Sequence, residues 1–190
     1  LADSPVRITP WIEDIDALSD TVDELIFQTY RGRETVADVD AYLARLYREI
    51  ALSAQLFDRD REVIQLHFGG GTPNFLTPAQ LGEVVETLRS QFRFSDAADR
   101  DISIELDPRF VDADDIAALG RIGFNRASFG VQDFDPAVQE AVNRIQSVEQ
   151  TRAVIDACRG NGFRSVNVDL IYGLPSQTTE GFARTLDTVA

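Results

Sequence analysis

The sequence predicts an α/β fold in which parallel strands alternate with helices. Short β-rich segments alternate with amphipathic segments of helical period from residue 63 onward, and residues that cap helices separate them. Each predicted strand also carries apolar side chains on one face and polar side chains on the other. This order implies parallel strands joined by right-handed crossovers, in either a barrel or a doubly wound sheet.

The first strand is predicted over residues 63–69, an apolar segment that ends in glycine. A helix over 77–92 follows, because Thr77 can act as its N-cap and Gln80 completes a capping box three residues later. A second β-rich segment, over residues 101–108, predicts the next strand.

The same order of elements is repeated after the second strand. Asp112 can cap a helix over 112–123 that ends in glycine, and a third strand is predicted over 126–134. Asp135-Pro136 is a typical start of a short helix.

The last pair of predicted elements is again a helix and a strand. Ser147 can cap a helix over 147–162, with Gln150 in the capping-box position, and a fourth strand is predicted over 165–173. The four strands and their helices therefore form one continuous βαβ pattern.

The two faces of these strands differ in polarity. The apolar faces hold Ile64, Leu66 and Phe68; Ile102, Ile104 and Leu106; Ala127, Phe129 and Val131; and Val166, Val168 and Leu170. The polar faces hold Gln65, His67 and Gly69; Ser103, Glu105 and Asp107; Ser128, Gly130 and Gln132; and Asn167 and Asp169. A parallel sheet that is buried on both sides usually has no polar face. The pattern favours a barrel whose lumen holds a polar ligand, and an open sheet with one wet face is the alternative.

In parallel barrels the ligand sits at the carboxyl ends of the strands. The candidates at these ends are Gly69–Thr72, Glu105, Asp107, Gln132, Asp133 and Asp169. Carboxylates accept hydrogen bonds from an ammonium group or from hydroxyls, and glycines let a ligand approach the backbone closely. The set therefore suits a zwitterionic or polyhydroxy ligand. A phosphate loop fits poorly, because the sequence has no lysine and the charges near the glycines are negative.

The composition limits the partners. With 18 basic and 32 acidic residues the net charge is −14, which argues against a nucleic-acid or anionic-membrane surface. No apolar stretch approaches the roughly 20 residues that a membrane span needs. One cysteine permits no internal disulfide, and we therefore expect a reducing, cytoplasmic location.

The two ends of the sequence predict a fragment of a larger protein. The sequence contains no methionine, and it stops at "TLDTVA", within a segment of helical period that has no capping residue. We therefore expect a partial barrel that is truncated at its C-terminus.

Four motifs resemble one known family. They are "HFGGGTPNFLTPAQL", "ISIELDPR", "GFNRASFGVQDFDPAVQEAVNRIQ" and "NVDLIYGLPSQT", and in this order they are similar to motifs of oxygen-independent coproporphyrinogen III oxidase. That family consists of radical S-adenosylmethionine (SAM) enzymes of haem biosynthesis. The resemblance covers residues from about 57 to 190. The related haem-chaperone-like branch fits less well, because it favours E-A-N-P where this sequence has E-L-D-P at 105–108.

The resemblance implies a partial (β/α) barrel of the radical SAM type, with SAM and a [4Fe-4S] cluster as cofactors. It assigns Gly70, Gly71 and Thr72 to the loop that receives the methionine end of SAM, and Glu105 to a carboxylate that contacts SAM. It places three further residues around a second SAM: Gln132, Arg144 and Asp169.

The activity that the resemblance implies is that of an oxidoreductase, a coproporphyrinogen dehydrogenase. Such an enzyme decarboxylates two propionate side chains of coproporphyrinogen III oxidatively to vinyl groups and so forms protoporphyrinogen IX. The substrate is therefore a porphyrinogen. The resemblance assigns neither a catalytic residue nor the electron donor.

The sequence departs from the family at the cluster. The family carries C-x-x-x-C-x-x-C ahead of the helix that leads into the glycine loop, but residues 1–35 contain no cysteine. They form an acidic lead-in that resembles no motif of the family. Residues 36–190 form the predicted part of the barrel and begin with a helix over 36–57.

No residue is predicted to bind a metal. Cys158, the single cysteine, lies on the packed face of its predicted helix, where a buried structural thiol is expected. His67 is the single histidine, and it is expected to shape the polar face as a hydrogen-bonding residue.

Three interpretations remain open at this point. The chain is a fragment of a coproporphyrinogen oxidase, a barrel module that binds SAM or haem without radical chemistry, or an inactive remnant. Tight binding of SAM without iron distinguishes the second from the others.

Overall fold

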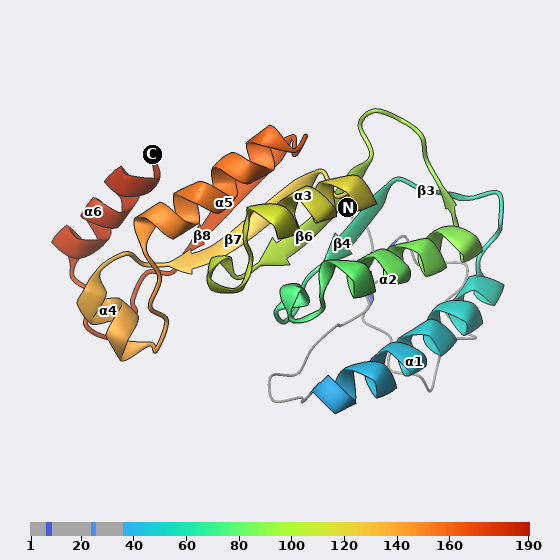
Figure 1. Cartoon of the computed structure of the whole chain (residues 1–190), viewed down its shortest axis with the longest axis horizontal. Helices are drawn as coiled ribbons and strands as arrows, with labels where there is room; N and C mark the ends of the chain where they lie inside the picture. The colour runs from blue at the N-terminus through green and yellow to red at the C-terminus, as the bar shows by residue number, and fades with distance from the viewer. Residues whose placement is uncertain (1–6, 9–23, 26–35) are drawn as a thin grey trace, which may run out of the picture. The chain divides into compact units, whose positions relative to one another are not determined.

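The computed structural model describes residues 7–8, 24–25 and 36–190 (Figure 1). The predicted lead-in, residues 1–35, lies outside these residues except for two short strands that pair in parallel. These strands are β1 (Arg7–Ile8) and β2 (Glu24–Leu25). The proposed boundary between lead-in and barrel therefore stays a prediction.

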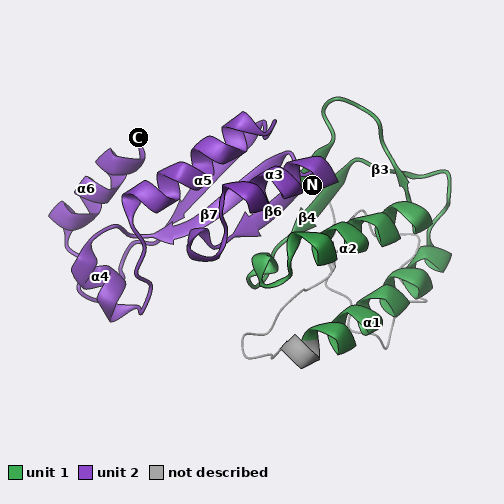
Figure 2. Cartoon of the chain, in the orientation of Figure 1, with its two compact units in different colours: residues 1–102 green, residues 103–190 purple. Residues whose placement is uncertain are grey.

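The chain divides into two compact units, residues 1–102 and residues 103–190 (Figure 2). From residue 36 the first unit contains α1 (Val36–Ser53), η2 (Ala54–Leu56), β3 (Glu62–Val63), β4 (Gln65–Phe68), η3 (Pro73–Phe75), α2 (Pro78–Gln91) and β5 (Arg93–Phe94). The strands β3 and β5 pair in parallel. The helices α1 and α2 pack against each other along two apolar stripes. These stripes are Val39, Leu43, Leu46 and Ile50, and Leu81, Val84, Val85 and Leu88.

The start of α2 confirms the capping box that the sequence predicts. The Thr77 side chain accepts a hydrogen bond from the Gln80 backbone N–H, and the Gln80 side chain accepts one from the Thr77 N–H at 3.0 Å. Pro78 occupies the first turn, where its missing N–H costs no helical hydrogen bond.

The predicted strand over residues 63–69 is wrong in its extent. It is divided into two strands at Ile64. Ile64 was expected on a buried apolar face, but it is 60% exposed. The backbone explains the break: β3 pairs with β5, while the Ile64 carbonyl accepts a hydrogen bond from the Asp101 N–H at 2.9 Å. One apolar run in the sequence thus supplies two short strands.

The second unit carries most of the parallel sheet. Its elements are β6 (Asp101–Leu106), which begins in the first unit, η4 (Pro108–Phe110), α3 (Ala113–Ile122), β7 (Arg126–Gln132), α4 (Pro136–Ala141), α5 (Val148–Gly160), β8 (Ser165–Leu170) and α6 (Thr179–Val189). In this unit β7 lies between β6 and β8, and both pairings are parallel. The predicted parallel α/β architecture is confirmed for these strands.

The apolar face of this sheet is covered by helices. Residues alternate between buried and half-buried along β6 and β7, as the sequence predicts. The helices α3 and α5 pack against each other and lie along the buried face (Figure 1). Phe129 and Ile116 are completely buried there. Burying an aliphatic or aromatic side chain of this size stabilises a fold by about 1.5–3 kcal/mol.

The predicted caps of the second unit are also confirmed. Asp112 caps α3 with a full capping box, and Gly123 ends the helix in the left-handed conformation. Asp135 caps α4, and the Ser147 side chain accepts a hydrogen bond from the Gln150 N–H at the start of α5. Each cap satisfies a backbone donor that the first helical turn leaves unpaired.

The carboxylate of Asp133 joins α6 to the end of β7. It is 1% exposed, and its Oδ1 accepts hydrogen bonds from the Asp135 N–H and the Thr185 hydroxyl. Its Oδ2 accepts one from the Gln177 side-chain amide at 2.6 Å. Burial alone would raise the pKa of Asp133, but the hydrogen bonds from the side chains of Gln177 and Thr185 and from the backbone N–H groups of Asp135 and Phe134 together lower that pKa.

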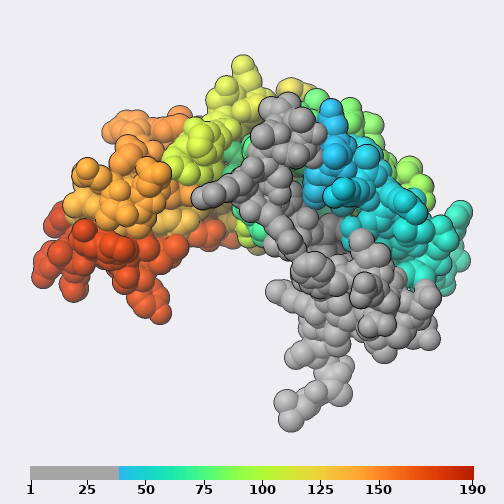
Figure 3. Space-filling view, turned by 90° about the horizontal axis from the view of Figure 1, so that it is seen from below, coloured from blue at the N-terminus to red at the C-terminus, as the bar shows by residue number. Residues whose placement is uncertain are grey.

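This network corrects one sequence interpretation. Asp133 was a candidate ligand residue at the end of a strand, but its oxygens hold the protein itself together. An ion pair between Arg184 and Asp135 at 3.3 Å adds to the same connection. In the space-filling view α6, in red, lies beside the α4 segment (Figure 3).

Among the described residues, no helix has the length and the apolar character needed to span a bilayer.

We expect Thr185→Val to destabilise the protein by about 1–3 kcal/mol, because a buried carboxylate oxygen and the Phe134 N–H then lose a partner. Thr188→Val on the same helix is the matched control, since the Thr188 hydroxyl is exposed and donates a hydrogen bond to the Arg184 carbonyl of its own helix. That change should stay within about 0.5 kcal/mol. Urea unfolding of both variants measures the difference, and equal losses would contradict the role of Asp133.

Candidate functional site

The polar face of the second unit forms two neighbouring rows across the strands. Glu105 of β6 lies in register with Ser128 of β7, and Ser128 lies in register with Asn167 of β8. One step nearer the carboxyl ends, Gly130 lies in register with Asp169. Because paired residues of parallel strands share a face, Glu105 and Asp169 lie on the same face of the sheet, one row apart.

Gln132 ends β7 in a strained conformation. Its φ is +72°, in the left-handed region that a non-glycine residue rarely adopts. A register irregularity lies between Gly130 and Gln132, and the Gln132 carbonyl accepts a hydrogen bond from the Ile171 N–H at 3.0 Å. A bulge of this kind redirects a side chain at the end of a strand and is frequent beside functional sites.

Gly130 makes room for two of the predicted ligand residues. A Cβ atom at this position would lie 2.9 Å from Nε2 of Gln132 and 3.2 Å from Nη2 of Arg144. Both distances are shorter than ordinary contacts of a Cβ atom. The amide of Gln132 and the guanidinium of Arg144 therefore both lie over Gly130, on the face that also holds Asp169.

Arg144 is held in place by the strand and by its own loop. Its Nη2 donates a hydrogen bond to the Gly130 carbonyl at 2.6 Å, and its Nη1 forms an ion pair with Asp107 at 3.1 Å. The backbone N–H of Arg144 bonds to the Gln139 carbonyl at 2.8 Å. Its Nε is buried and has no partner among the described residues.

Two buried glutamines attach the loop between α4 and α5 to the sheet. The Gln139 amide donates to the carbonyls of Asp133 and Gln146, both at 3.0 Å, and its oxygen accepts from the Gln146 N–H. The Gln146 amide in turn donates to the Val131 carbonyl. Arg144 thus lies on a loop that is attached at both ends to the chain at the carboxyl end of β7, through Val131 and Asp133.

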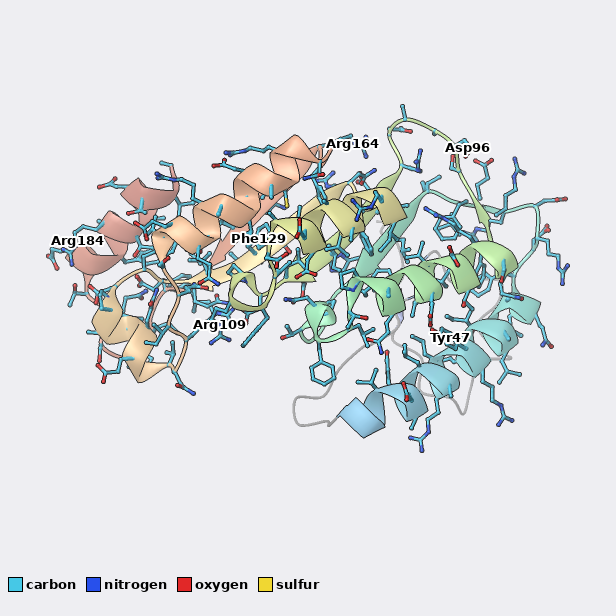
Figure 4. The ribbon with its side chains drawn as sticks, in the orientation of Figure 1. Tyr47, Asp96, Arg109, Phe129, Arg164 and Arg184 are labelled. Carbon is cyan, nitrogen blue, oxygen red and sulfur yellow. The ribbon has the colours of Figure 1, made fainter. Side chains whose placement is uncertain are left out.

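Asp107 is the anion beside Arg144. It is 5% exposed and also forms an ion pair with Arg109, whose Nη2 lies 2.7 Å from Oδ2. Arg109 is labelled in Figure 4. Burial by itself would raise the pKa of Asp107, but hydrogen bonds from Arg109 and the charges of both arginines lower it overall. For Arg144 burial lowers the pKa and Asp107 opposes that effect, and an arginine stays protonated at any physiological pH.

The glycine loop belongs to the first unit. Gly70 has a φ of +80°, which glycine adopts without strain, and both Gly70 and Gly71 are exposed after the end of β4. Thr72 is half-buried, and its carbonyl accepts a hydrogen bond from the Phe75 N–H at 2.9 Å. The loop therefore exposes backbone, as a loop that receives a ligand requires.

The structure brings four of the predicted site residues together in one unit: Glu105, Gln132, Arg144 and Asp169. The predicted residues Gly70, Gly71 and Thr72 lie in the other unit.

Sequence reasoning missed the residues that support Arg144. Arg109 stands two positions after Asp107, a spacing that could have suggested a forked pair. Nothing in the sequence points to Gln139 and Gln146, because their partners are backbone carbonyls that only the folded chain brings near.

The described residues do not fit an iron–sulfur cluster. Such clusters are held by cysteine thiolates. Cys158 is 0% exposed, and burial raises its pKa to about 12, which confirms the predicted buried thiol. His67 lies exposed on β4. Within the described part of the chain no group of three or more histidine, cysteine or acidic side chains could hold a metal ion.

A family model of the radical SAM superfamily matches residues 31–189. The chain belongs to the radical SAM superfamily. The predicted family and fold class are therefore confirmed at the level of the superfamily, and the two predicted cofactors, SAM and a [4Fe-4S] cluster, are those of the superfamily.

Curated relatives carry the name that the sequence motifs suggest. The oxygen-independent coproporphyrinogen III oxidase of Pseudomonas aeruginosa is 52% identical over 148 residues, which are 78% of this chain and 32% of that protein. The enzyme of the same name from Escherichia coli is 50% identical over 151 residues, or 80% of this chain and 32% of that protein. The chain thus spans about a third of the length of these relatives.

A solved structure supports the fold. Coproporphyrinogen III oxidase from Escherichia coli, a radical SAM enzyme, matches with a TM-score of 0.79 and 46% identity. The match covers 86% of this chain and 37% of the solved chain. The partial α/β fold of the radical SAM type is therefore confirmed.

The two cofactors of the superfamily fit this chain differently. SAM carries a sulfonium, an ammonium, a carboxylate and ribose hydroxyls. The polar face offers two carboxylates, an amide and a guanidinium with a buried, unpartnered Nε, and these donors and acceptors fit SAM. No such fit exists for the cluster, because these 190 residues contain one cysteine and its thiol is buried.

We expect Cys158 in the folded chain to react with a thiol reagent at pH 8 at least about 100-fold more slowly than in urea, because a buried, protonated thiol is a poor nucleophile. Ala153→Cys in a Cys158→Ala background is the control, since Ala153 is exposed on the same helix and its replacement should react fast. Comparable rates for the two folded proteins would contradict the burial of Cys158.

We expect Asp107→Asn to destabilise the protein by about 1–3 kcal/mol at pH 7, because two guanidinium groups lose their carboxylate. The folded-state pKa of Asp107 is lowered, so its contribution is complete above the ordinary aspartate pKa of about 4 and is lost as the pH falls through the lower folded value.

Urea unfolding from pH 7 down to pH 2 checks this expectation. The stability difference between the unmodified chain and Asp107→Asn should shrink only below about pH 4. Asp156→Asn is the matched control, because Asp156 is exposed on α5 and should change stability little at every pH. A difference for Asp107→Asn that does not depend on pH would contradict the ion pairs.

Proposed function

We propose that this chain forms the SAM-binding part of an oxygen-independent coproporphyrinogen III oxidase, an oxidoreductase of haem biosynthesis. The observation that carries the proposal is a sequence identity of 50–52% to relatives of that name, over 78–80% of this chain. A likeness of this extent is much stronger than a shared fold, which by itself implies no function.

The proposed SAM contacts follow from the charges of the site. Arg144 suits the carboxylate of a methionine moiety, because a guanidinium binds a carboxylate through two parallel hydrogen bonds. Asp169 and Glu105 suit the ammonium group, the sulfonium or the ribose hydroxyls, and Gln132 can donate and accept at the end of β7. The loop Gly70–Thr72, with Gly70 and Gly71 exposed and Thr72 half-buried, suits the methionine end of a SAM molecule.

The substrate and the location belong to the same proposal. The substrate is coproporphyrinogen III, whose two propionates are decarboxylated to vinyl groups in protoporphyrinogen IX. The free, buried Cys158 supports a reducing cytoplasm, where no disulfide is required. The net charge of −14 supports partners other than nucleic acids or anionic membranes.

A second candidate function is favoured by the missing thiolates. SAM supplies radical chemistry in this superfamily only when a cluster of iron and sulfur reduces it. These 190 residues do not supply the ligands of such a cluster. The chain alone is then a module that binds SAM, or binds haem as the haem-chaperone-like branch does, and does not oxidise a porphyrinogen. An inactive remnant would bind neither SAM nor haem.

Calorimetric titration of the iron-free chain with SAM tests the proposal. We expect binding, and a loss of about tenfold in affinity for Asp169→Asn, because that change removes one charge-assisted acceptor worth about 1.4 kcal/mol. Asp156→Asn is the matched control, since it makes the same change on an exposed helix surface and should bind SAM as the unmodified chain does.

Iron content after anaerobic reconstitution with ferrous iron and sulfide distinguishes the two candidates. Iron near background together with SAM binding supports a SAM-binding module. About four irons per chain would show that the chain itself holds a [4Fe-4S] cluster and would overturn the ligand argument. No binding of SAM to the iron-free or the reconstituted chain would contradict the proposed function.

A further inference from the structure

Asp107 forms ion pairs with two arginines, although one arginine would neutralise its single negative charge. Its Oδ1 accepts hydrogen bonds from the backbone N–H and the Nε of Arg109, both at 3.0 Å, and its Oδ2 accepts one from Nη2 at 2.7 Å. This is the forked pairing that satisfies a carboxylate most completely. Arg144 then adds its Nη1 to the same Oδ2 at 3.1 Å.

The second arginine is not explained by stability. Two guanidinium groups beside one carboxylate leave one excess positive charge, and the two arginines repel each other. Burial lowers the pKa of Arg144, and its Nε is buried without a partner, so the arrangement costs free energy. A local arrangement that is unfavourable for folding is typical of a functional site.

The position of Arg144 is fixed from a second direction. Its Nη2 bonds to the Gly130 carbonyl at 2.6 Å, directly over a residue that has no side chain. Asp107 follows β6 and Gly130 lies in β7, so one guanidinium is fixed to two neighbouring strands. These two contacts use two of its five N–H donors, and its side chain remains 20% exposed.

We infer that Asp107 and Gly130 act together as positioning residues that fix the Arg144 guanidinium for the carboxylate of a bound ligand. This inference deepens the proposed function and rests on it for the identity of the ligand, SAM. Neither Asp107 nor Gly130 contacts the ligand in this arrangement. Arg109 shares the charge of Asp107 and thereby leaves Arg144 with a net positive charge for an incoming carboxylate.

A double-mutant cycle tests the coupling without any ligand. Asp107→Asn, Arg144→Gln and the double variant are unfolded in urea, and their unfolding equilibrium constants are compared. If Asp107 holds Arg144, the effects of the two single changes are not additive, and we expect a coupling of at least about fivefold in the equilibrium constant. Additive effects would overturn the inference.

SAM affinity of the folded variants tests the positioning role. We expect Asp107→Asn to bind SAM at least about tenfold more weakly, although Asp107 itself does not contact the ligand. Asp112→Ala is the control for lost stability, because it removes the cap of α3 and should cost about 1 kcal/mol without changing SAM affinity. Coupling in the cycle with unchanged SAM affinity would show a structural role only and would overturn the inference.

Gly130→Ala provides a second test that leaves both charges in place. The added Cβ should displace the ends of Arg144 and Gln132, and SAM affinity should fall by about tenfold or more while Asp107 stays paired with Arg109. Gly160→Ala is the matched control, since nothing lies within 4 Å of its Cβ position. Full SAM affinity in Gly130→Ala would overturn the role of this residue.

The same experiments separate this inference from the proposed function. If the unmodified chain binds no SAM, the proposed function fails, whereas the double-mutant cycle still decides whether Asp107 holds Arg144. If the unmodified chain binds SAM and every variant binds equally well, the proposed function stands and the positioning role fails.

Discussion

The site depends on the parallel register of three strands. Because β7 pairs with β6 on one side and with β8 on the other, Glu105, Gly130 and Asp169 arrive on one face of the sheet in two adjacent rows. A shift by one residue would turn the side chains of Glu105 and Asp169 toward the helices α3 and α5. The apolar side chains on the opposite face, including the fully buried Phe129, prevent such a shift. The hydrophobic core therefore determines where the polar groups of the site lie.

Several departures from regular structure lie at the carboxyl end of β7 and in the loop that carries Arg144. Gln132 has a positive φ at an irregularity of the register, and Arg144 and Gln146 each leave one buried polar atom without a partner. Each of these features costs free energy. Two more non-glycine residues of this unit, Asn143 and Ser176, also have a positive φ. The buried hydrogen bonds of Gln139 and Asp133 offset part of this cost. The unfavourable features named here lie at or beside the predicted ligand residues Gln132 and Arg144, as expected if function and not stability selects them.

The sequence was sufficient for features that depend on neighbours along the chain. The caps at Thr77 and Asp112 and the two faces of β6 and β7 follow from local spacing, and the structure confirms them. Features that depend on distant partners were not predictable. The break at Ile64 arises because β3 pairs with a strand about thirty residues later along the chain, and Asp133 binds a threonine 52 positions away. The role of Arg109 was missed for a related reason, because only the fold brings Arg144 to the same carboxylate.

The same geometry separates the proposed SAM contacts from the single thiol. Cys158 is completely buried on α5, which packs against α3 and β8 on the helix-covered side of the sheet. Glu105 and Asp169 lie on the opposite, polar face. A change of rotamer moves a sulfur atom by only a few ångströms, so Cys158 cannot reach that face without unfolding the helix layer. The proposed SAM contacts on the polar face therefore lie apart from this thiol. Radical chemistry on the polar face would need cluster thiolates that these 190 residues, with their single buried cysteine, do not supply.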